Sequence, residues 1–138
     1  MTPYRLIEHT ADGGLVIEAA NAEALFAEAA LALADQVVDR RSLRAVESRT
    51  VTAEAMDWTD LMINWLREVL YLMNGEQWLV KEAAVETLSE TRLSARLAGE
   101  SFDPARHALK SEIKAVTYHQ ARVDHQGGLW RARVILDL

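Results

Sequence analysis

The stretch that decides the fold is DWTDLMINWLREVLYLMNG, residues 57–75. Its apolar residues recur at intervals of three and four, the spacing of one helix face. That face comprises Trp58, Leu61, Met62, Trp65, Leu66, Val69, Leu70 and Met73. Asp57 is a suitable N-cap, Asp60 follows as in a capping box, and Gly75 lies where a left-handed residue often ends a helix. So wide a stripe is typical of a helix packed on the core, and a partner-binding groove is the alternative.

One further helix is expected before this one. Asn21 is a good N-cap, Glu23 suits the first turn, and an Ala- and Leu-rich run continues to about Asp35. Asp12-Gly13-Gly14 is predicted to be a turn, because glycine adopts positive φ readily. Alternating or β-branched segments predict strands at residues 4–9, 15–20, 43–53, 78–88, 91–98, 114–123 and 129–137.

The second half of the chain is strand after strand, and Gly127-Gly128 marks a tight connection before the last one. A doubly wound parallel sheet would alternate strands and helices to the end, so that class is excluded. The pattern predicts an α+β fold, a two-layer sandwich with two main helices packed on a mostly antiparallel sheet. Since the chain has 138 residues, half of them hydrophobic, residues 1–138 are expected to form a single domain.

Composition excludes several function classes. There is no cysteine, so disulfides, thiolate zinc sites and cysteine nucleophiles are excluded. The net charge of −6 argues against direct, tight nucleic-acid binding, which depends on cations displacing counterions. It suits a basic protein partner, or simply keeps the protein in solution. No apolar run is long enough for a membrane helix or a signal peptide, so a cytoplasmic location is expected.

Two acidic positions near opposite ends of the sequence are candidate metal ligands. Asp12 precedes two glycines, and Asp137 is followed by Leu138, whose α-carboxylate adds a second oxygen donor. If the final strand lies beside the segment that contains Asp12, these carboxyl groups converge and favour a divalent cation. The alternative is a turn cap and a solvated chain end. Distance along the sequence leaves both open.

Other polar residues give weaker signals. No two histidines have helical zinc-motif spacing, so His9, His107 and His119 are interpreted as surface or supporting residues, and His125 as a turn residue. Glu100, Glu112 and Lys114 form an acid/base cluster or, more simply, the wet side of a strand. The serines lack a nucleophile-elbow setting, and no phosphate-binding loop is present.

Several motifs together point to a known family. His9-Thr10-Ala11-Asp12 resembles the N-terminal signature of the archease family. The C-terminal signature of that family is matched by Gly99-Glu100, His107 and residues 112–119. Trp65-Leu66 and the closing segment 130–137 also look like the family's pattern, so the likeness spans nearly the whole chain. One departure is Gly13, where the family usually has a large aliphatic residue.

The resemblance implies an α+β fold and the role of a non-enzymatic protein cofactor. The partner would be an RtcB-type RNA ligase, whose guanylylation and multiple turnover it promotes in tRNA splicing and RNA repair. The implied metal ligands are Asp12, Asp137 and Leu138, and the implied ion is calcium, with magnesium or manganese as alternatives. His9, Glu100 and Lys114 would support this site or contact the ligase.

Two other functions remain as alternatives. A small metal-dependent hydrolase would use the same carboxylates and turn over substrate without a partner. A general protein chaperone would bind clients through the apolar stripe of residues 58–73 and expose a large apolar patch.

Overall fold

The computed structural model describes residues 4–8 and 12–138, with side chains for Tyr4 and residues 13–138. The elements follow in the order β1 (Tyr4–Glu8), β2 (Asp12–Ala19), α1 (Ala22–Val37), the short 3-10 helix η1 (Arg40–Ser42), β3 (Glu47–Glu54), α2 (Trp58–Asn74), β4 (Trp78–Ser89), β5 (Arg92–Ser101), β6 (Ala115–Gln126) and β7 (Leu129–Asp137). The predicted α+β class, with two main helices packed on antiparallel sheet, is confirmed.

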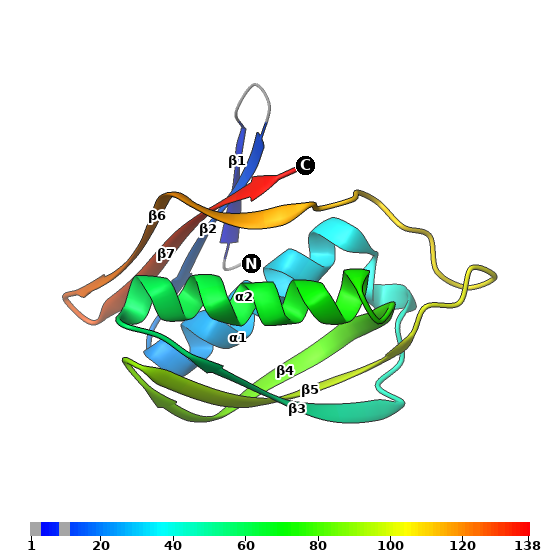
Figure 1. Ribbon diagram of the computed structural model, residues 1–138, viewed down its shortest axis with the longest axis horizontal. Coiled ribbons are helices and arrows are strands. Elements are labelled where there is room, and N and C mark those ends of the chain that lie inside the picture. Colours follow the sequence, from blue (N-terminus) through cyan, green and yellow to red (C-terminus); the bar gives the residue numbers. More distant parts are fainter. Residues whose placement is uncertain (1–3, 9–11) are drawn as a thin grey trace.

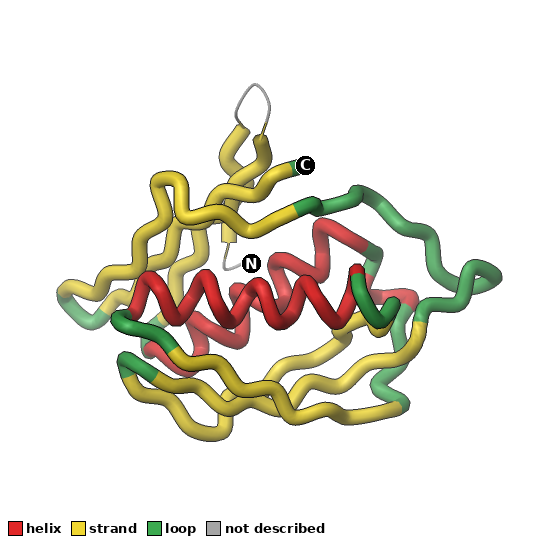
Figure 2. Tube along the Cα trace, in the orientation of Figure 1, coloured by secondary structure: helices red, strands yellow, loops and turns green. Residues whose placement is uncertain are grey.

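The strands divide into two antiparallel sheets, a division that the sequence pattern does not reveal. One sheet has the order β1-β2-β7-β6, and the other has the order β3-β5-β4. Both helices contact both sheets: α1 contacts β2 and β4, and α2 contacts β6 and β3. In Figure 2 the two red helices accordingly run between the two groups of yellow strands.

The two helices begin where the sequence predicts. The Asn21 side chain accepts a hydrogen bond from the Ala24 amide at 2.8 Å, and the Asp57 side chain accepts one from the Asp60 amide at 2.8 Å. Each cap satisfies an N–H group that has no partner within its helix. The Asp60 side chain in turn accepts a hydrogen bond from the Met56 amide at 2.9 Å. Side chains at both Asp57 and Asp60 therefore bond backbone amides at the start of this helix.

The predicted left-handed conformation of Gly75 is wrong. Gly75 has φ −82° and ψ −40°, which any residue adopts. Glycine is required there for space, because a Cβ atom would lie 2.8 Å from the Tyr71 ring and 2.9 Å from its carbonyl oxygen. The left-handed residue that follows the helix is Gln77, with φ 53°.

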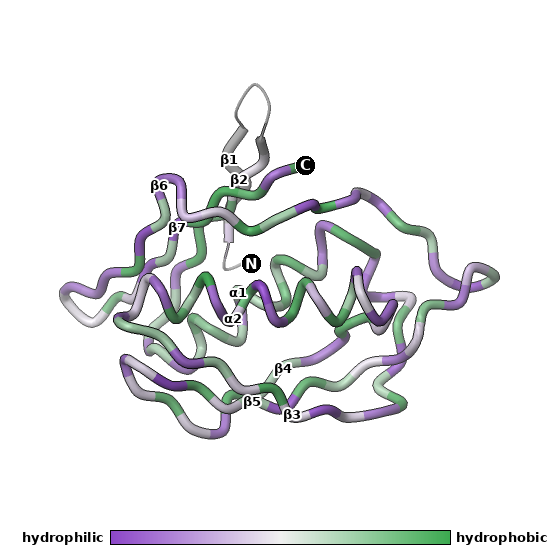
Figure 3. Tube along the Cα trace, in the orientation of Figure 1, coloured by the Kyte–Doolittle hydropathy of each residue, from purple (hydrophilic) through white to green (hydrophobic). Residues whose placement is uncertain are grey.

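The apolar stripe of α2 forms the centre of the core. Its members from Leu61 to Met73 are buried, and Trp58 is half-buried against the aromatic ring of Trp130. Trp65 is fully buried, and its indole N–H donates to the Phe26 carbonyl of α1 at 2.9 Å. Figure 3 shows hydrophobic and hydrophilic positions alternating along α2, as expected for a helix with one buried face. The stripe is core, so the partner-groove alternative is wrong.

Two strands begin three or more residues away from their predicted starts. Asp12-Gly13-Gly14 is not a turn but the first part of β2, because strands pair with it on both sides: Gly13 lies opposite Glu8 of β1 and Leu136 of β7. The strand predicted from residue 43 begins at Glu47, since η1 and an extended segment precede it. The Gly127-Gly128 turn is confirmed, with φ of 60° and 81° as two-residue hairpins require.

None of the helices in the described part of the chain has the length and apolar character needed to cross a membrane.

Candidate metal site at the paired ends of β2 and β7

The strand register brings the two acidic positions of the sequence together. Asp12, the first residue of β2, lies directly opposite Asp137, the last residue of β7. In an antiparallel pair, directly opposed residues have Cα atoms about 4.5–5.5 Å apart. The ends of β1, β2 and β7 therefore meet at one extremity of the molecule, where Figure 1 places the C-terminal end.

Strand β7 is held on both sides up to its last residue. Asp137 lies opposite Asp12 of β2 and Ala115 of β6, and its carbonyl accepts a hydrogen bond from the Lys114 amide at 2.7 Å. Burial of Val134, Ile135 and Leu136 anchors the same segment. The segment that carries Asp137 is thus part of a strand paired on both sides. The alternative of a frayed chain end does not describe it.

Leu138 occupies the space that a side chain at position 13 would take. A Cβ atom on Gly13 would lie 3.1 Å from Leu138 Cδ1. Leu138 is nevertheless 47% exposed. The departure from the family pattern at Gly13 is therefore accommodated by Leu138, which packs over the glycine.

The donor chemistry of this strand end fits a hard divalent ion. Asp137 is exposed, and among the described residues its carboxylate has no hydrogen-bond or ion-pair partner. No three His, Asp or Glu side chains of the described part gather as a metal cluster; the side chain of Asp12 lies outside it. Carboxylate and carbonyl oxygens are the donors that calcium, magnesium and manganese prefer.

Of the predicted supporting residues that the structure describes, Lys114 lies beside Asp137 and Glu100 does not. His9 lies outside the described residues. Lys114 is exposed and is linked to Asp137 through its backbone amide. Glu100 lies on β5, in the other sheet, and is only 6% exposed. The interpretation of Glu100 as part of a wet strand face with Glu112 and Lys114 is wrong, because a loop packs over it.

Glu100 organises a buried polar cluster in that loop. Its carboxylate accepts hydrogen bonds from both terminal nitrogens of Arg106 and from the Arg44 amide, the last at 2.7 Å. His107 Nε2 lies 3.1 Å from Glu100 Oε2, while His107 Nδ1 accepts from the Asp103 amide at 2.9 Å. Since Nδ1 is an acceptor, the neutral ring carries its proton on Nε2 and donates to Glu100. His107 is therefore a buried structural residue.

Hydrogen bonds from Arg106 lower the pKa of Glu100 from 4.5 to about 2, against the opposing effect of burial. A depressed pKa means that ionised Glu100 stabilises the folded state above about pH 4.5 and that this contribution is lost as pH falls toward 2. We expect Glu100→Gln to lower the free energy of unfolding by about 2 kcal/mol at pH 7, less than for a fully buried pair because Arg106 is 31% exposed. Urea unfolding at pH 7 and pH 2.5 should show that the difference in the free energy of unfolding between wild type and variant is smaller at pH 2.5. An equal difference at both pH values would contradict the stabilising role of ionised Glu100.

The other two histidines have different surroundings. His125 is not a turn residue: it belongs to β6, opposite Trp130, and its ring stacks on the indole at 4.2 Å between centroids. His119 is exposed on a bulge of β6, where the pairing with β7 shifts between Thr117 and Arg122. Gln120, in the same bulge, has φ 53°.

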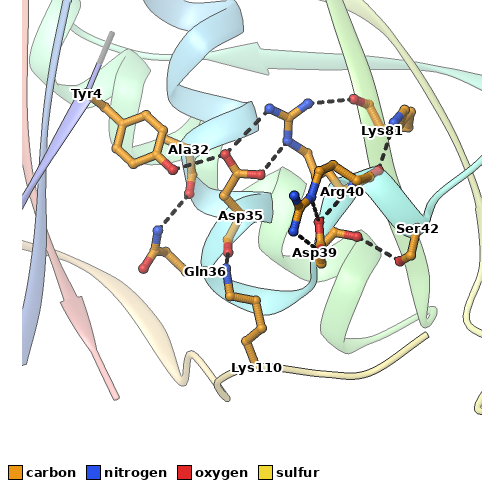
Figure 4. A network of polar contacts seen from close by, with 10 residues as sticks. Tyr4, Ala32, Asp35, Gln36, Asp39, Arg40, Ser42, Lys81 and Lys110 are labelled. Atoms are coloured by element: carbon orange, nitrogen blue, oxygen red, sulfur yellow. Dashed lines mark hydrogen bonds and ion pairs between the residues drawn. The ribbon is translucent and has the colours of Figure 1, made fainter. Parts of the chain in front are cut away.

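A second polar network, which the sequence pattern does not predict, lies at the end of α1. Figure 4 shows Asp35 between the Tyr4 hydroxyl and the Arg40 guanidinium, at 3.0 and 2.6 Å. Burial and the Asp35 hydrogen bond raise the pKa of Tyr4 to about 12. Arg40 also donates to the Lys81 carbonyl at 3.0 Å. The consecutive Arg40-Arg41 pair was the available signal, but only the fold brings Tyr4 and Lys81 to it.

Comparison with known proteins identifies the family to which this α+β chain belongs. The model of the archease protein family matches residues 4–138. The chain belongs to the archease family.

Named relatives cover the chain from end to end. Protein archease of Methanopyrus kandleri is 34% identical over 139 residues, which is 99% of each protein. Protein archease of Thermococcus gammatolerans is 36% identical over 142 residues, covering all of both.

Solved structures agree with this fold. The solution structure of protein 1598 of Methanobacterium thermoautotrophicum superimposes with a TM-score of 0.84 at 29% identity, with complete coverage of both chains. The crystal structure of a Thermotoga maritima protein described as an archease and possible chaperone has a TM-score of 0.62 at 20% identity. It covers 96% of this chain and 94% of that one, and it supports the fold alone.

Proposed function

We propose that this protein is a non-enzymatic, metal-binding activator of an RtcB-type RNA ligase. The observation that carries the proposal is the pairing of Asp12 with Asp137 across β2 and β7. Membership of the archease family supports a role through a partner protein, and the ligase as that partner is part of the proposal. The protein promotes guanylylation of the ligase, which then completes many turnovers in tRNA splicing and RNA repair.

The proposed ligands are the carboxylates of Asp12 and Asp137 together with Leu138. Directly opposed residues of an antiparallel pair share one face of the sheet, which favours a shared ion. Two adjacent carboxylates repel each other unless a cation lies between them. Calcium suits such an exposed oxygen site best, since it accepts irregular coordination of six to eight oxygens, with magnesium or manganese as alternatives. The bound ion would supply positive charge close to the phosphates handled by the ligase.

The shape and charge of the molecule suit such a role. The strand end that carries Asp137 lies at an extremity, so it can reach into a partner's site (Figure 1). The net charge of −6 favours a basic protein surface and disfavours RNA. Lys114 lies next to Asp137 and is exposed, so it is placed to contact the ligase.

The chaperone alternative loses its proposed binding surface. The stripe of α2 that would hold clients is buried in the core. No observation in the described part of the chain favours a partner-independent hydrolase over the activator.

The decisive experiment mixes the protein with an RtcB-type ligase, GTP and a divalent ion, and follows ligase guanylylation. We expect a faster first guanylylation and continued turnover in the presence of the protein. A ligase rate that is the same with and without it would refute the proposed function. Hydrolysis of GTP or RNA phosphoesters by the protein alone would favour the hydrolase.

A further inference from the structure

A basic pocket lies beside the C-terminal end of α1, in a part of the fold separate from the candidate metal site. Its volume is about 660 Å³. Its charged walls come from four segments and consist of Asp35, Asp39, Arg40, Arg41, Lys81 and Lys110. Four cationic side chains and two carboxylates leave an excess of two positive charges, in a protein whose net charge is −6. The pocket therefore has a charge opposite in sign to that of the whole protein.

Each of the two carboxylates already accepts hydrogen bonds from an arginine. Asp35 accepts from Arg40 Nε at 2.6 Å. Asp39 accepts from Arg41 Nε at 3.0 Å and from Arg41 Nη2 at 2.9 Å. Hydrogen bonds from the Arg41 side chain and backbone lower the pKa of Asp39 to about 2, with a smaller contribution from the charge of Lys110. The two carboxylates therefore neutralise the arginines and leave the lysines as the excess charge.

Each of the two lysine ammonium groups donates one hydrogen bond to a backbone carbonyl and has further N–H donors without a partner in the described residues. Lys81 Nζ donates to the Arg40 carbonyl at 2.8 Å, and Lys110 Nζ donates to the Asp35 carbonyl at 2.7 Å (Figure 4). An ammonium group has three N–H donors, so each retains two. Neither ammonium forms an ion pair with a carboxylate of the described residues. Two cations are thus held at one pocket with unused hydrogen-bonding capacity.

Compensation of the α1 dipole accounts for only part of this arrangement. The carbonyl end of a helix carries about half a negative charge, which attracts a cation such as Lys110. Half a charge does not balance an excess of two. Because Lys81 and Lys110 both line the pocket, the remaining positive charge lies at its wall.

The same pocket has one apolar wall. Leu109 lines it, is 57% exposed, and belongs to a segment pinned by a β-bridge to Val38. An exposed leucine beside two lysines suits a ligand with a charged end and an apolar body. We propose that this pocket binds an organic phosphate, with the phosphate against Lys81 and Lys110 and the organic group against Leu109. A phosphate dianion matches the excess of two charges, and lysine binds phosphate as a point charge.

The test is a titration of the full-length protein, followed by amide chemical shifts, with phenyl phosphate, inorganic phosphate and phenol as probes. We expect phenyl phosphate to shift the amides of residues 39–41, 81 and 109–110, and to bind more tightly than inorganic phosphate. Phenol should not bind. Equal affinity for the two phosphates would overturn the role of Leu109, and shifts confined to other residues would overturn the site.

Charge-removing variants complete the test. Lys81→Gln and Lys110→Gln keep an N–H donor near the same carbonyls, so each should weaken phenyl phosphate binding about tenfold, the loss of one charge-assisted hydrogen bond. Arg96→Gln, on the exposed side of β5 and outside the pocket, is the matched control and should bind as wild type. Melting temperatures identify any variant that fails to fold. Unchanged affinity in both pocket variants would overturn the proposal, whatever the result with the ligase.

Discussion

Asp137→Asn is expected to reduce the stimulation of ligase guanylylation to the rate of the ligase alone, and Asp12→Asn is expected to do the same. Both residues are proposed ligands of one ion, and their positions are directly opposed across β2 and β7. Replacing a carboxylate by an amide removes the charge with little change of shape. Calcium affinity should fall by at least about 100-fold, since loss of residues that merely support ligands already costs 10–100-fold. Isothermal titration and a guanylylation assay measure the two effects.

Asp124→Asn is the matched control for these variants. Asp124 is exposed on β6 of the same sheet, near the hairpin at the other end of β7, opposite Arg131. The change in net charge is the same. Equal loss of stimulation in Asp124→Asn would mean that overall charge, and no particular site, governs the interaction.

Gly99→Ala is expected to have the largest effect on stability. Gly99 lies on β5, the central strand of its sheet, between β3 and β4. A Cβ atom there would lie 1.9 Å from the Leu79 carbonyl oxygen and 2.9 Å from its carbon. These are backbone atoms of a paired strand, so relief requires the sheet itself to move. We expect the free energy of unfolding to fall by about 3 kcal/mol or more and the melting temperature to fall by about 10 °C.

Gly13→Ala provides the contrast, because it adds the same methyl group to a strand. Its Cβ would meet only the side chain of Leu138, at 3.1 Å, and that side chain can move. Thermal unfolding followed by circular dichroism should show a small change, within about 1 kcal/mol. Similar losses for both variants would mean that the approach of Gly99 to Leu79 is not what limits stability.

The local pattern of the sequence predicted the helices well because their signals are local. The caps at Asn21 and Asp57 and the stripe around Trp65 depend on neighbours within a few turns. The division into two sheets and the pairing of β2 with β7 depend on contacts between distant segments. Local propensity cannot rank such pairings, so it predicts a turn at Asp12-Gly13-Gly14, where pairing with β1 and β7 forms a strand.

The polar residues show the same limit. Alternation along a strand suggested that Glu100 faces water, because the loop that carries Arg106 and His107 is invisible to periodicity. For Asp12 and Asp137, spacing left two alternatives and only the family resemblance favoured a shared site. The register now adds a physical reason for that hypothesis: the two positions are opposite each other on paired strands.

The most direct test of the proposed metal site is a crystal structure of the protein grown with calcium. We expect one ion bound by the side chains of both Asp12 and Asp137, with Leu138 contributing an oxygen. An ion bound elsewhere, or a strand end in which the two carboxylates diverge and hold none, would contradict it.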